Sequence, residues 1–196
     1  MDLPHYFGRD LRRHERSWDD FAAICAFLDD RAVCRVALNG DPFPYVVPTS
    51  FRFVRDEARG DAVLLHTSKS GHFAKAVERD PHLCIVVDES IAFLKAPQAE
   101  NTSLEYASVI FRCIAEIERD PAAIERQQYE VLEKYRPEGG FDPITPGVAD
   151  YIVGIRARVV EMTAKRRIVA EAKSPEPPYR AYMFPASERL STLTPR

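Results

Sequence analysis

The chain has 196 residues, which suits a single domain that buries a hydrophobic core of its own. Its formal net charge is −3 and 45% of its residues are hydrophobic, so the composition gives no reason to expect a nucleic acid or an anionic membrane as a partner. No apolar run approaches the roughly 20 residues of a membrane span, and the first residues lack the apolar stretch of a secretory signal.

The four cysteines lie far apart in apolar stretches and form no CxxC pair: Cys25, Cys34, Cys84 and Cys113. This spacing favours reduced, buried thiols in a cytoplasmic protein over a disulfide framework. The five histidines show neither HxxxH nor HxH spacing, so we expect no metal site.

Residues 1–16 read as a polar arm, and the pattern Ser17-x-x-Asp20 predicts the start of a first helix. The Asn39-Gly40 pair predicts a hairpin turn. A second helix is expected over 71–79, and the pair Asp120-Pro121 begins a third. Apolar or alternating runs predict strands at 32–38, 45–54, 62–66, 83–87, 104–117 and 151–162, with an irregular stretch over 91–103.

Strands outnumber helices and are separated by hairpin signals, which favours a mainly β, α+β fold: an antiparallel barrel with helices packed around it. Neither GxGxxG nor GxxxxGK[ST] occurs, so a doubly wound or P-loop nucleotide site is not expected. We divide the chain into an N-terminal arm at 1–16, a barrel domain at 17–170 and a proline-rich C-terminal tail at 171–196.

The stretch HTSKSGHFAK, residues 66–75, stands where a strand ends and a helix begins. Hydroxyl side chains, a glycine and basic residues meet there, and the unpaired N–H groups of a helix N-terminus favour an anion such as phosphate. The alternative is that Ser70 simply caps the helix and the lysines are solvated, which the residues alone favour because serine caps are common.

Five pieces follow one another along the chain: YVVPTSF at 45–51, LLHTS at 64–68 with Gly71, DPHLC at 80–84, YASVI at 106–110 and MTAK at 162–165. In this order they resemble the pyridoxamine 5'-phosphate oxidase-like split-barrel superfamily, and within it the nitroimidazole-resistance branch. The resemblance covers roughly residues 31–165.

The resemblance implies a six-stranded antiparallel split barrel that forms a homodimer and binds FMN at the subunit interface. The segment 48–50 would run beside the flavin ring, and the segment 66–72 would hold the ribityl chain and the phosphate. His66 stands where that branch has its functional histidine, so it is the candidate catalytic residue. The candidate cofactor-binding residues are Pro48, Thr49, Ser50, His66, Thr67, Ser68, Lys69, Ser70, Gly71, His72, Ser108 and Arg112.

Two departures from the family pattern bear on the ligand. Phe73 stands where relatives have a phosphate-pairing lysine, and Arg112-Cys113 stands where they have glycine. Arg112 is expected in mid-strand between Ile110 and Ile114, where an arginine needs an anionic partner. That partner is either the ligand phosphate or an acid such as Glu116.

The favoured function is therefore that of an FMN-dependent oxidoreductase acting on a small-molecule substrate, a nitroaromatic or another electron acceptor. One alternative is a split barrel that binds haem or a deazaflavin without turnover, and another is a dimeric scaffold without a ligand. For His66, the plainer reading is a strand-end histidine bonded to the backbone.

Overall fold

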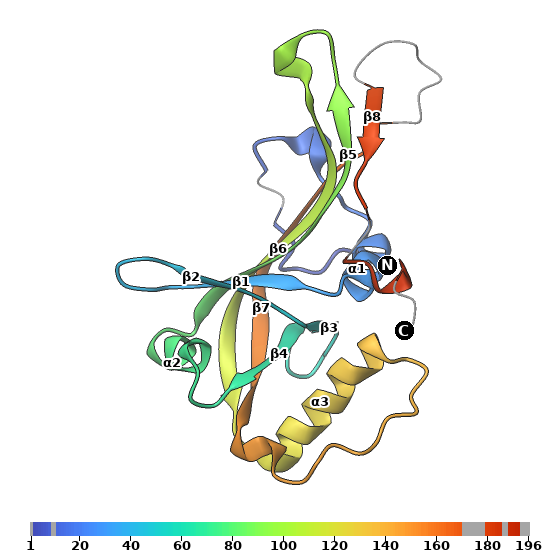
Figure 1. The fold of residues 1–196 in the computed structure, drawn as a ribbon. Helices are drawn as coiled ribbons and strands as arrows, with labels where there is room; N and C mark the ends of the chain where they lie inside the picture. The colour runs from blue at the N-terminus through green and yellow to red at the C-terminus, as the bar shows by residue number, and fades with distance from the viewer. Residues whose placement is uncertain (1, 9–10, 170–178, 186–187, 193–196) are drawn as a thin grey trace.

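The computed structural model describes residues 2–8, 11–169, 179–185 and 188–192, and its centre is one antiparallel sheet (Figure 1). In this part of the chain the sheet has eight strands in the order β2-β1-β5-β6-β7-β4-β3, with β8 beside β5. The strands are β1 (Cys34–Leu38), β2 (Tyr45–Thr49), β3 (Arg52–Val54), β4 (Ala62–Ser68), β5 (His82–Lys95), β6 (Ser103–Glu118), β7 (Ile152–Arg167) and β8 (Tyr179–Met183).

The sheet curls into a barrel because its two ends belong to one chain segment. β2 and β3 stand at opposite ends of the strand order, yet only Ser50 and Phe51 separate them along the chain. The predicted strand 45–54 is therefore one bent segment that joins both edges of the sheet. Six strands make the split barrel when β2 and β3 count together, and β8 is additional, so the predicted fold class is confirmed.

The alternation predicted for the strands separates a packed inner face from an outer face. β1 buries Cys34, Val36 and Leu38, with Arg35 and Ala37 turned outward. Several strands are longer than predicted. In particular, β5 continues to Lys95, so the expectation of irregular structure from residue 91 was wrong. The continuation pairs with both β6 and β8, which satisfies the backbone groups of that stretch.

Three α-helices and four short 3-10 helices occur among the described residues. Helix α1 begins at Phe21 and not at Ser17, because Asp20 supplies the cap by accepting a hydrogen bond from the Ala23 N–H at 3.0 Å. The caps at Gly71 and Asp120 lie where the sequence predicted the other two helices to begin. The helices are α1 (Phe21–Asp30), α2 (His72–Arg79), α3 (Pro121–Tyr135), η1 (His14–Arg16), η2 (Ala99–Asn101), η3 (Val148–Asp150) and η4 (Leu190–Thr192).

The N-terminal arm lies along the part of β7 that β4 leaves uncovered. Gly8 donates its N–H to the Met162 carbonyl at 2.7 Å, and the Met162 N–H is donated to the Tyr6 carbonyl at 2.9 Å. Tyr6, Phe7 and Leu11 are buried. The arm therefore protects an open strand edge and contributes apolar side chains to the core.

The C-terminal segment adds strand β8 to the outer half of β5, from Ala92 to Lys95. Most of the proline-rich stretch predicted to trail over the surface lies outside the described residues. No described helix has the length and apolar character that crossing a membrane requires.

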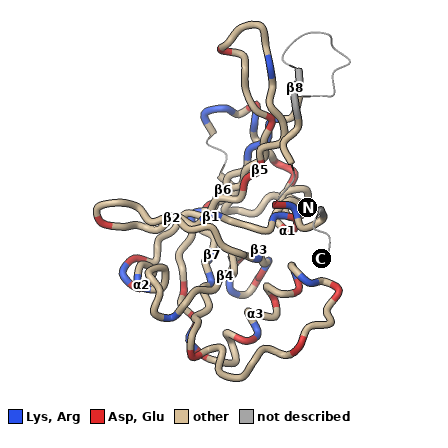
Figure 2. The backbone as a smooth tube through the Cα atoms, viewed as in Figure 1, with Lys and Arg blue, Asp and Glu red and all other residues tan. Residues whose placement is uncertain are grey.

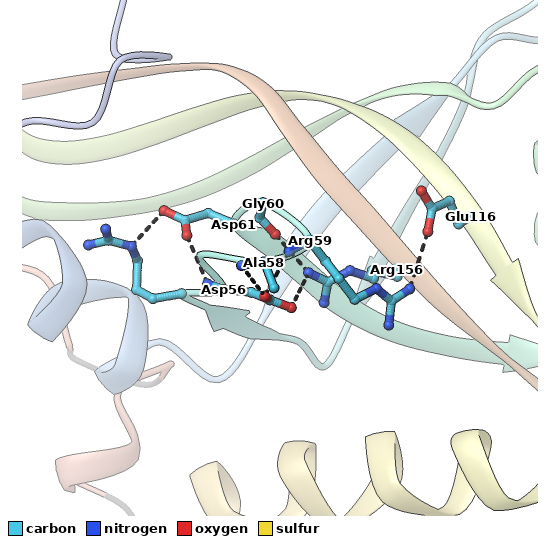
Figure 3. A network of polar contacts seen from close by, with 8 residues as sticks. Asp56, Ala58, Arg59, Gly60, Asp61, Glu116 and Arg156 are labelled. Carbon is cyan, nitrogen blue, oxygen red and sulfur yellow. Dashed lines mark hydrogen bonds and ion pairs between the residues drawn. The ribbon is translucent and has the colours of Figure 1, made fainter.

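The turn between β3 and β4 is held by the polar network drawn in Figure 3. Asp56 accepts two hydrogen bonds from N–H groups of its own turn, at 3.0 and 2.9 Å, and a third from Arg156 at 2.9 Å. Arg156 also donates to the Gly60 carbonyl at 2.7 Å, and Asp61 pairs with Arg55 at 2.6 Å. These groups satisfy one another, so the network closes one side of the barrel.

Candidate functional site

The corner between β4 and α2 has the geometry of an anion site. Gly71, and not Ser70, is the N-cap of α2, so the alternative that Ser70 caps the helix was wrong, and no side chain of the described residues caps its first turn. Gly71 allows a close approach here, because a Cβ would lie in tight contact, 3.1 Å, with the Ser68 carbonyl oxygen. The hydroxyl groups of Ser68 and Ser70 belong to exposed residues beside this helix N-terminus.

Exposed basic side chains surround the same corner, and Figure 2 shows Lys and Arg positions around α2. Lys69, His72 and Lys75 are exposed, and within the described residues neither lysine forms an ion pair with a carboxylate. Phe73, which replaces the family's lysine, is 5% exposed and packs with the barrel core. Positive charge at this corner therefore comes from exposed residues around α2 and not from position 73.

His66 faces away from the barrel interior. It pairs with Gly154 of β7, and directly opposite residues of an antiparallel pair point to the same side of the sheet. A Cβ on Gly154 would lie 2.9 Å from Gln127 of α3, so His66 lies on the face that α3 covers. Its Nδ1 is buried and finds no hydrogen-bond partner in the described part of the chain, and burial lowers the pKa of His66. Nδ1 therefore does not form the hydrogen bond to the backbone that the plainer reading of His66 expects.

A second group of candidate residues lies on the outer side of β2, β1, β5, β6 and β7, which we call the open face. Pro48 lies opposite Arg35, and Val86 of the next strand lies opposite Ile110. No described helix covers these residues, and Val46 and Ile110 are 57% and 38% exposed. The open face consists of Val46, Pro48, Arg35, Ala37, Cys84, Val86, Asp88, Ser108, Ile110, Arg112, Glu161, Thr163 and Lys165.

Arg112 lies in mid-strand, as predicted, and has the anionic partner that the sequence led us to expect. Its side chain is 70% exposed and pairs with Glu161 of β7 at 2.7 Å. The acid predicted as the alternative partner, Glu116, pairs instead with Arg59 at 3.4 Å. The outward side of β6 has no covering layer in one chain, so Arg112 does not require a ligand to satisfy its charge.

The structure brings some of the candidate residues together and separates others. Pro48, Ser108 and Arg112 share the open face. The Tyr45 ring lies 4.6 Å from the His72 ring between centroids, but Tyr45 lies opposite the buried Leu38 and faces inward, so it does not connect the open face to the corner. Thr49 lies opposite Cys34, which is fully buried, so it faces inward and is not part of that face.

Three hollows in the described part of the chain lie next to α3, the N-terminal arm and the C-terminal segment. One of about 190 Å³ beneath α3 and one of about 360 Å³ beside the N-terminal arm are both lined by members of the network in Figure 3. A third, also about 360 Å³, is bordered by Arg31, Arg35 and Asp88. Sequence reasoning missed it because the C-terminal segment that closes it lies more than 150 residues from Arg31, and no local pattern connects the two.

A family model described as pyridoxamine 5'-phosphate oxidase matches residues 20–166. A search among curated proteins found no match. Three solved structures resemble the chain at identities that establish the fold alone. The flavocytochrome Anf3 from Azotobacter vinelandii has 23% identity and a TM-score of 0.71, and the match covers 84% of this chain and 75% of that chain. An FAD and heme binding protein from Mycobacterium smegmatis has 18% identity and a TM-score of 0.64, with 74% of this chain and 70% of that chain covered. A putative 5-nitroimidazole antibiotic resistance protein from Bacteroides thetaiotaomicron has 19% identity and a TM-score of 0.63, with 76% of this chain and 85% of that chain covered.

Proposed function

Because the chain belongs to the pyridoxamine 5'-phosphate oxidase family, we propose that it is a flavoprotein that binds FMN and catalyses a redox reaction on a small molecule. The observation that carries the proposal is the corner between β4 and α2, where a helix N-terminus without a side-chain cap meets exposed hydroxyl and basic groups. The names of two similar structures, a flavocytochrome and an FAD and heme binding protein, support a flavin-type ligand.

The residues at the corner fit the phosphate end of such a cofactor. Ser68 and Ser70 offer hydroxyl donors, the first turn of α2 offers N–H groups, Lys69 offers positive charge and His72 offers a ring N–H. Pro48 lies on the open face, where a flat ring can rest against the sheet. The bound flavin supplies the electron transfer.

His66 is the candidate for moving a proton. Burial favours its neutral form, so Nδ1 or Nε2 is able to accept a proton at neutral pH, and Nδ1 has no hydrogen-bond partner within the described residues. His66 lies on the side of β4 that α3 covers. It therefore reaches a ligand at the corner only from beneath that helix.

We also propose that the protein is a homodimer that joins two copies through the open face. Exposed apolar side chains on an uncovered sheet favour a protein partner, and Val46 and Ile110 supply them. Sedimentation at micromolar concentration is expected to show a species of twice the 22.3 kDa chain mass. Ile110→Glu should shift it to monomer, whereas Ile168→Glu, at an equally exposed position outside the face, should not. A monomeric wild-type chain contradicts the homodimer.

The flavin is tested by the absorption spectrum of the protein after incubation with FMN and dialysis. A retained flavin band is expected, and the double variant with Ser68→Ala and Ser70→Ala should lose most of it while unfolding at the same temperature as wild type. Thr102→Ala, an exposed hydroxyl position at the far end of the β5–β6 hairpin, is the control. If the double variant retains as much FMN as wild type, the phosphate binds at another place in the protein.

Haem is the second candidate ligand, favoured by the names of the same two structures. An intense Soret band in the purified protein, without a flavin band, would identify haem and not FMN as the ligand. The same absorption measurement also tests for a deazaflavin. A colourless protein that takes up no FMN is the result expected for a scaffold. The likeness to a putative 5-nitroimidazole antibiotic resistance protein makes nitroaromatic compounds the first electron acceptors to assay.

A further inference from the structure

The hollow of about 360 Å³ near Arg31 lies between the barrel and the C-terminal segment. This segment is tied to the barrel at both ends. The Phe184 N–H donates to the Ile91 carbonyl at 2.9 Å, and the Ala32 N–H donates to the Glu188 carbonyl at 2.9 Å. The hollow is lined by Arg31, Arg35, Asp88, Glu89, Ser90, Phe184, Pro185 and Glu188.

Arg31 forms the buried side of this hollow. It is 3% exposed, pairs with Asp30, and pairs with Glu89 at 2.9 Å, while its guanidinium carbon lies 5.0 Å from the centre of the Phe27 ring. Its Nε is buried and has no hydrogen-bond partner among the residues that the structure describes. A buried N–H of a charged group without an acceptor is costly, so an acceptor oxygen in the hollow beside Arg31 would be stabilised.

The mouth of the hollow carries both signs of charge. Arg35 pairs with Asp88 at 2.9 Å and with Glu188 at 3.1 Å, and these three side chains are between 38% and 43% exposed. The two bonds engage Nη1 and Nη2, so the five-donor guanidinium of Arg35 has further N–H groups to offer. With Glu89, the lining holds three carboxylates against two guanidinium groups. A ligand that brings only negative charge is therefore disfavoured.

The hollow adjoins the residues that we place beside the flavin. Arg35 lies directly opposite Pro48 on β2, and Asp88 lies directly opposite Ser108 on β6. Directly opposite strand residues have Cβ atoms about 5 Å apart on the same face of a sheet. A molecule in the hollow is therefore next to any ring that rests on Pro48.

We propose that this hollow is the substrate subsite of the flavin site and that it binds a small zwitterion of the amino-acid type. The carboxylate would face Arg31 and Arg35, and the ammonium group would face Asp88 and Glu188. The two ligand charges match the two signs that line the hollow, and its volume lies within the range of small-ligand sites. Its role as a substrate subsite rests on the proposed flavin function, whereas the binding of the zwitterion does not.

Binding is tested by calorimetric titration of the flavin-free protein with the standard L-amino acids, followed by the N-acetyl and amide derivatives of the tightest binder. We expect at least one amino acid to bind and both derivatives to bind at least about tenfold more weakly, because each lacks one charge. Glu188→Gln should weaken binding about tenfold, and Arg35→Gln should do the same. Glu138→Gln, which alters an exposed carboxylate paired with Arg136 elsewhere, should change the affinity by less than about twofold.

Two results would overturn the proposal: no amino acid binds, or Glu188→Gln and Arg35→Gln bind the amino acid as wild type does. The substrate role is tested separately with the protein loaded with FMN, where the amino acid should shift the visible flavin band. If the amino acid binds without such a shift, the hollow is a ligand site but not the substrate subsite of the flavin site. A protein that retains no FMN refutes the proposed function, while the titration of the flavin-free protein still decides what the hollow binds.

Discussion

Lys134 in the last turn of α3 gives the chain a stability that depends on pH. Its Nζ donates to the Leu28 carbonyl at 2.9 Å and lies 3.4 Å from the centre of the Phe51 ring. Within the described residues it forms no ion pair with a carboxylate. Burial lowers its pKa to about 7, outweighing the opposing attraction of Asp29.

The direction of the effect follows from proton linkage. The ordinary lysine pKa of 10.5 applies to the unfolded chain, so above pH 7 the unfolded chain binds more protons at this position than the folded chain does. The cost of burying the charge is fully present below pH 7 and disappears as the pH rises towards 10.5. Between pH 7 and 8.5 the free energy of unfolding should therefore rise by roughly 1.5 kcal/mol on account of Lys134.

The assay is urea unfolding of wild type and Lys134→Met at four pH values from 7.0 to 8.5. Methionine keeps an unbranched, flexible side chain without the charge. We expect wild type to gain about 1.5 kcal/mol relative to the variant across this range. The range stops at 8.5 because burial raises the pKa of Cys34 to about 12, and its ionisation in the unfolded chain lowers stability above that pH. If the free energy of unfolding changes equally with pH in the two proteins, the reasoning is refuted.

Three further substitutions test contacts around the barrel by urea unfolding. Arg112→Ala should lower the free energy of unfolding by less than about 1 kcal/mol, because its pair with Glu161 is exposed; a larger loss would mean that Arg112 is structural. Tyr135→Phe should lower the free energy of unfolding by about 1–3 kcal/mol, because the Tyr135 hydroxyl accepts a hydrogen bond at 2.9 Å from the N–H of Phe51, which is fully buried at the β2–β3 bend. An unchanged free energy would show that this N–H finds another acceptor. Gly154→Ala should cost about 1–3 kcal/mol by displacing Gln127, and less in a Gln127→Ala background; equal costs in both would exclude that clash.

The strands could be predicted because alternation and turn residues are local signals. The β1–β2 hairpin and the Asp120-Pro121 helix start lie where the sequence placed them. The tight Asn39-Gly40 turn was wrong, because residues 39–44 connect the two strands and neither residue of the pair has a positive φ. The start of α1 was misplaced by four residues because Ser17 and Asp20 are both able to cap a helix. Ser17 instead bonds Asp19, and the choice between the two caps depends on how the helix packs on the barrel.

The candidate site was predicted less well than the fold, because alternation separates two faces of a strand without saying what covers each. Both faces of β6 carry large apolar residues: Val109 and Phe111 point inward, and Ile110 points outward. The need of Arg112 for an anionic partner was inferred from its apolar neighbours, but its side chain is 70% exposed in one chain, so water also satisfies its charge. Similarly, no local pattern indicates that Arg31 meets Glu188 across a hollow.

Phe73 shows how packing and function meet at the same helix. Its burial in the core beside Ala74 and Val77 means that a lysine there would have to bury its stem and extend its charge past the strands. Phenylalanine fills this space with apolar area and stabilises the end of the barrel. In the proposed flavin site, the corner would hold the phosphate through the N–H groups of α2 and through exposed residues such as Lys69, whose charges are screened by salt. Phe73 adds core packing but no positive charge, so in the proposed site the strength of phosphate binding would depend on the hydroxyl and backbone donors of the corner.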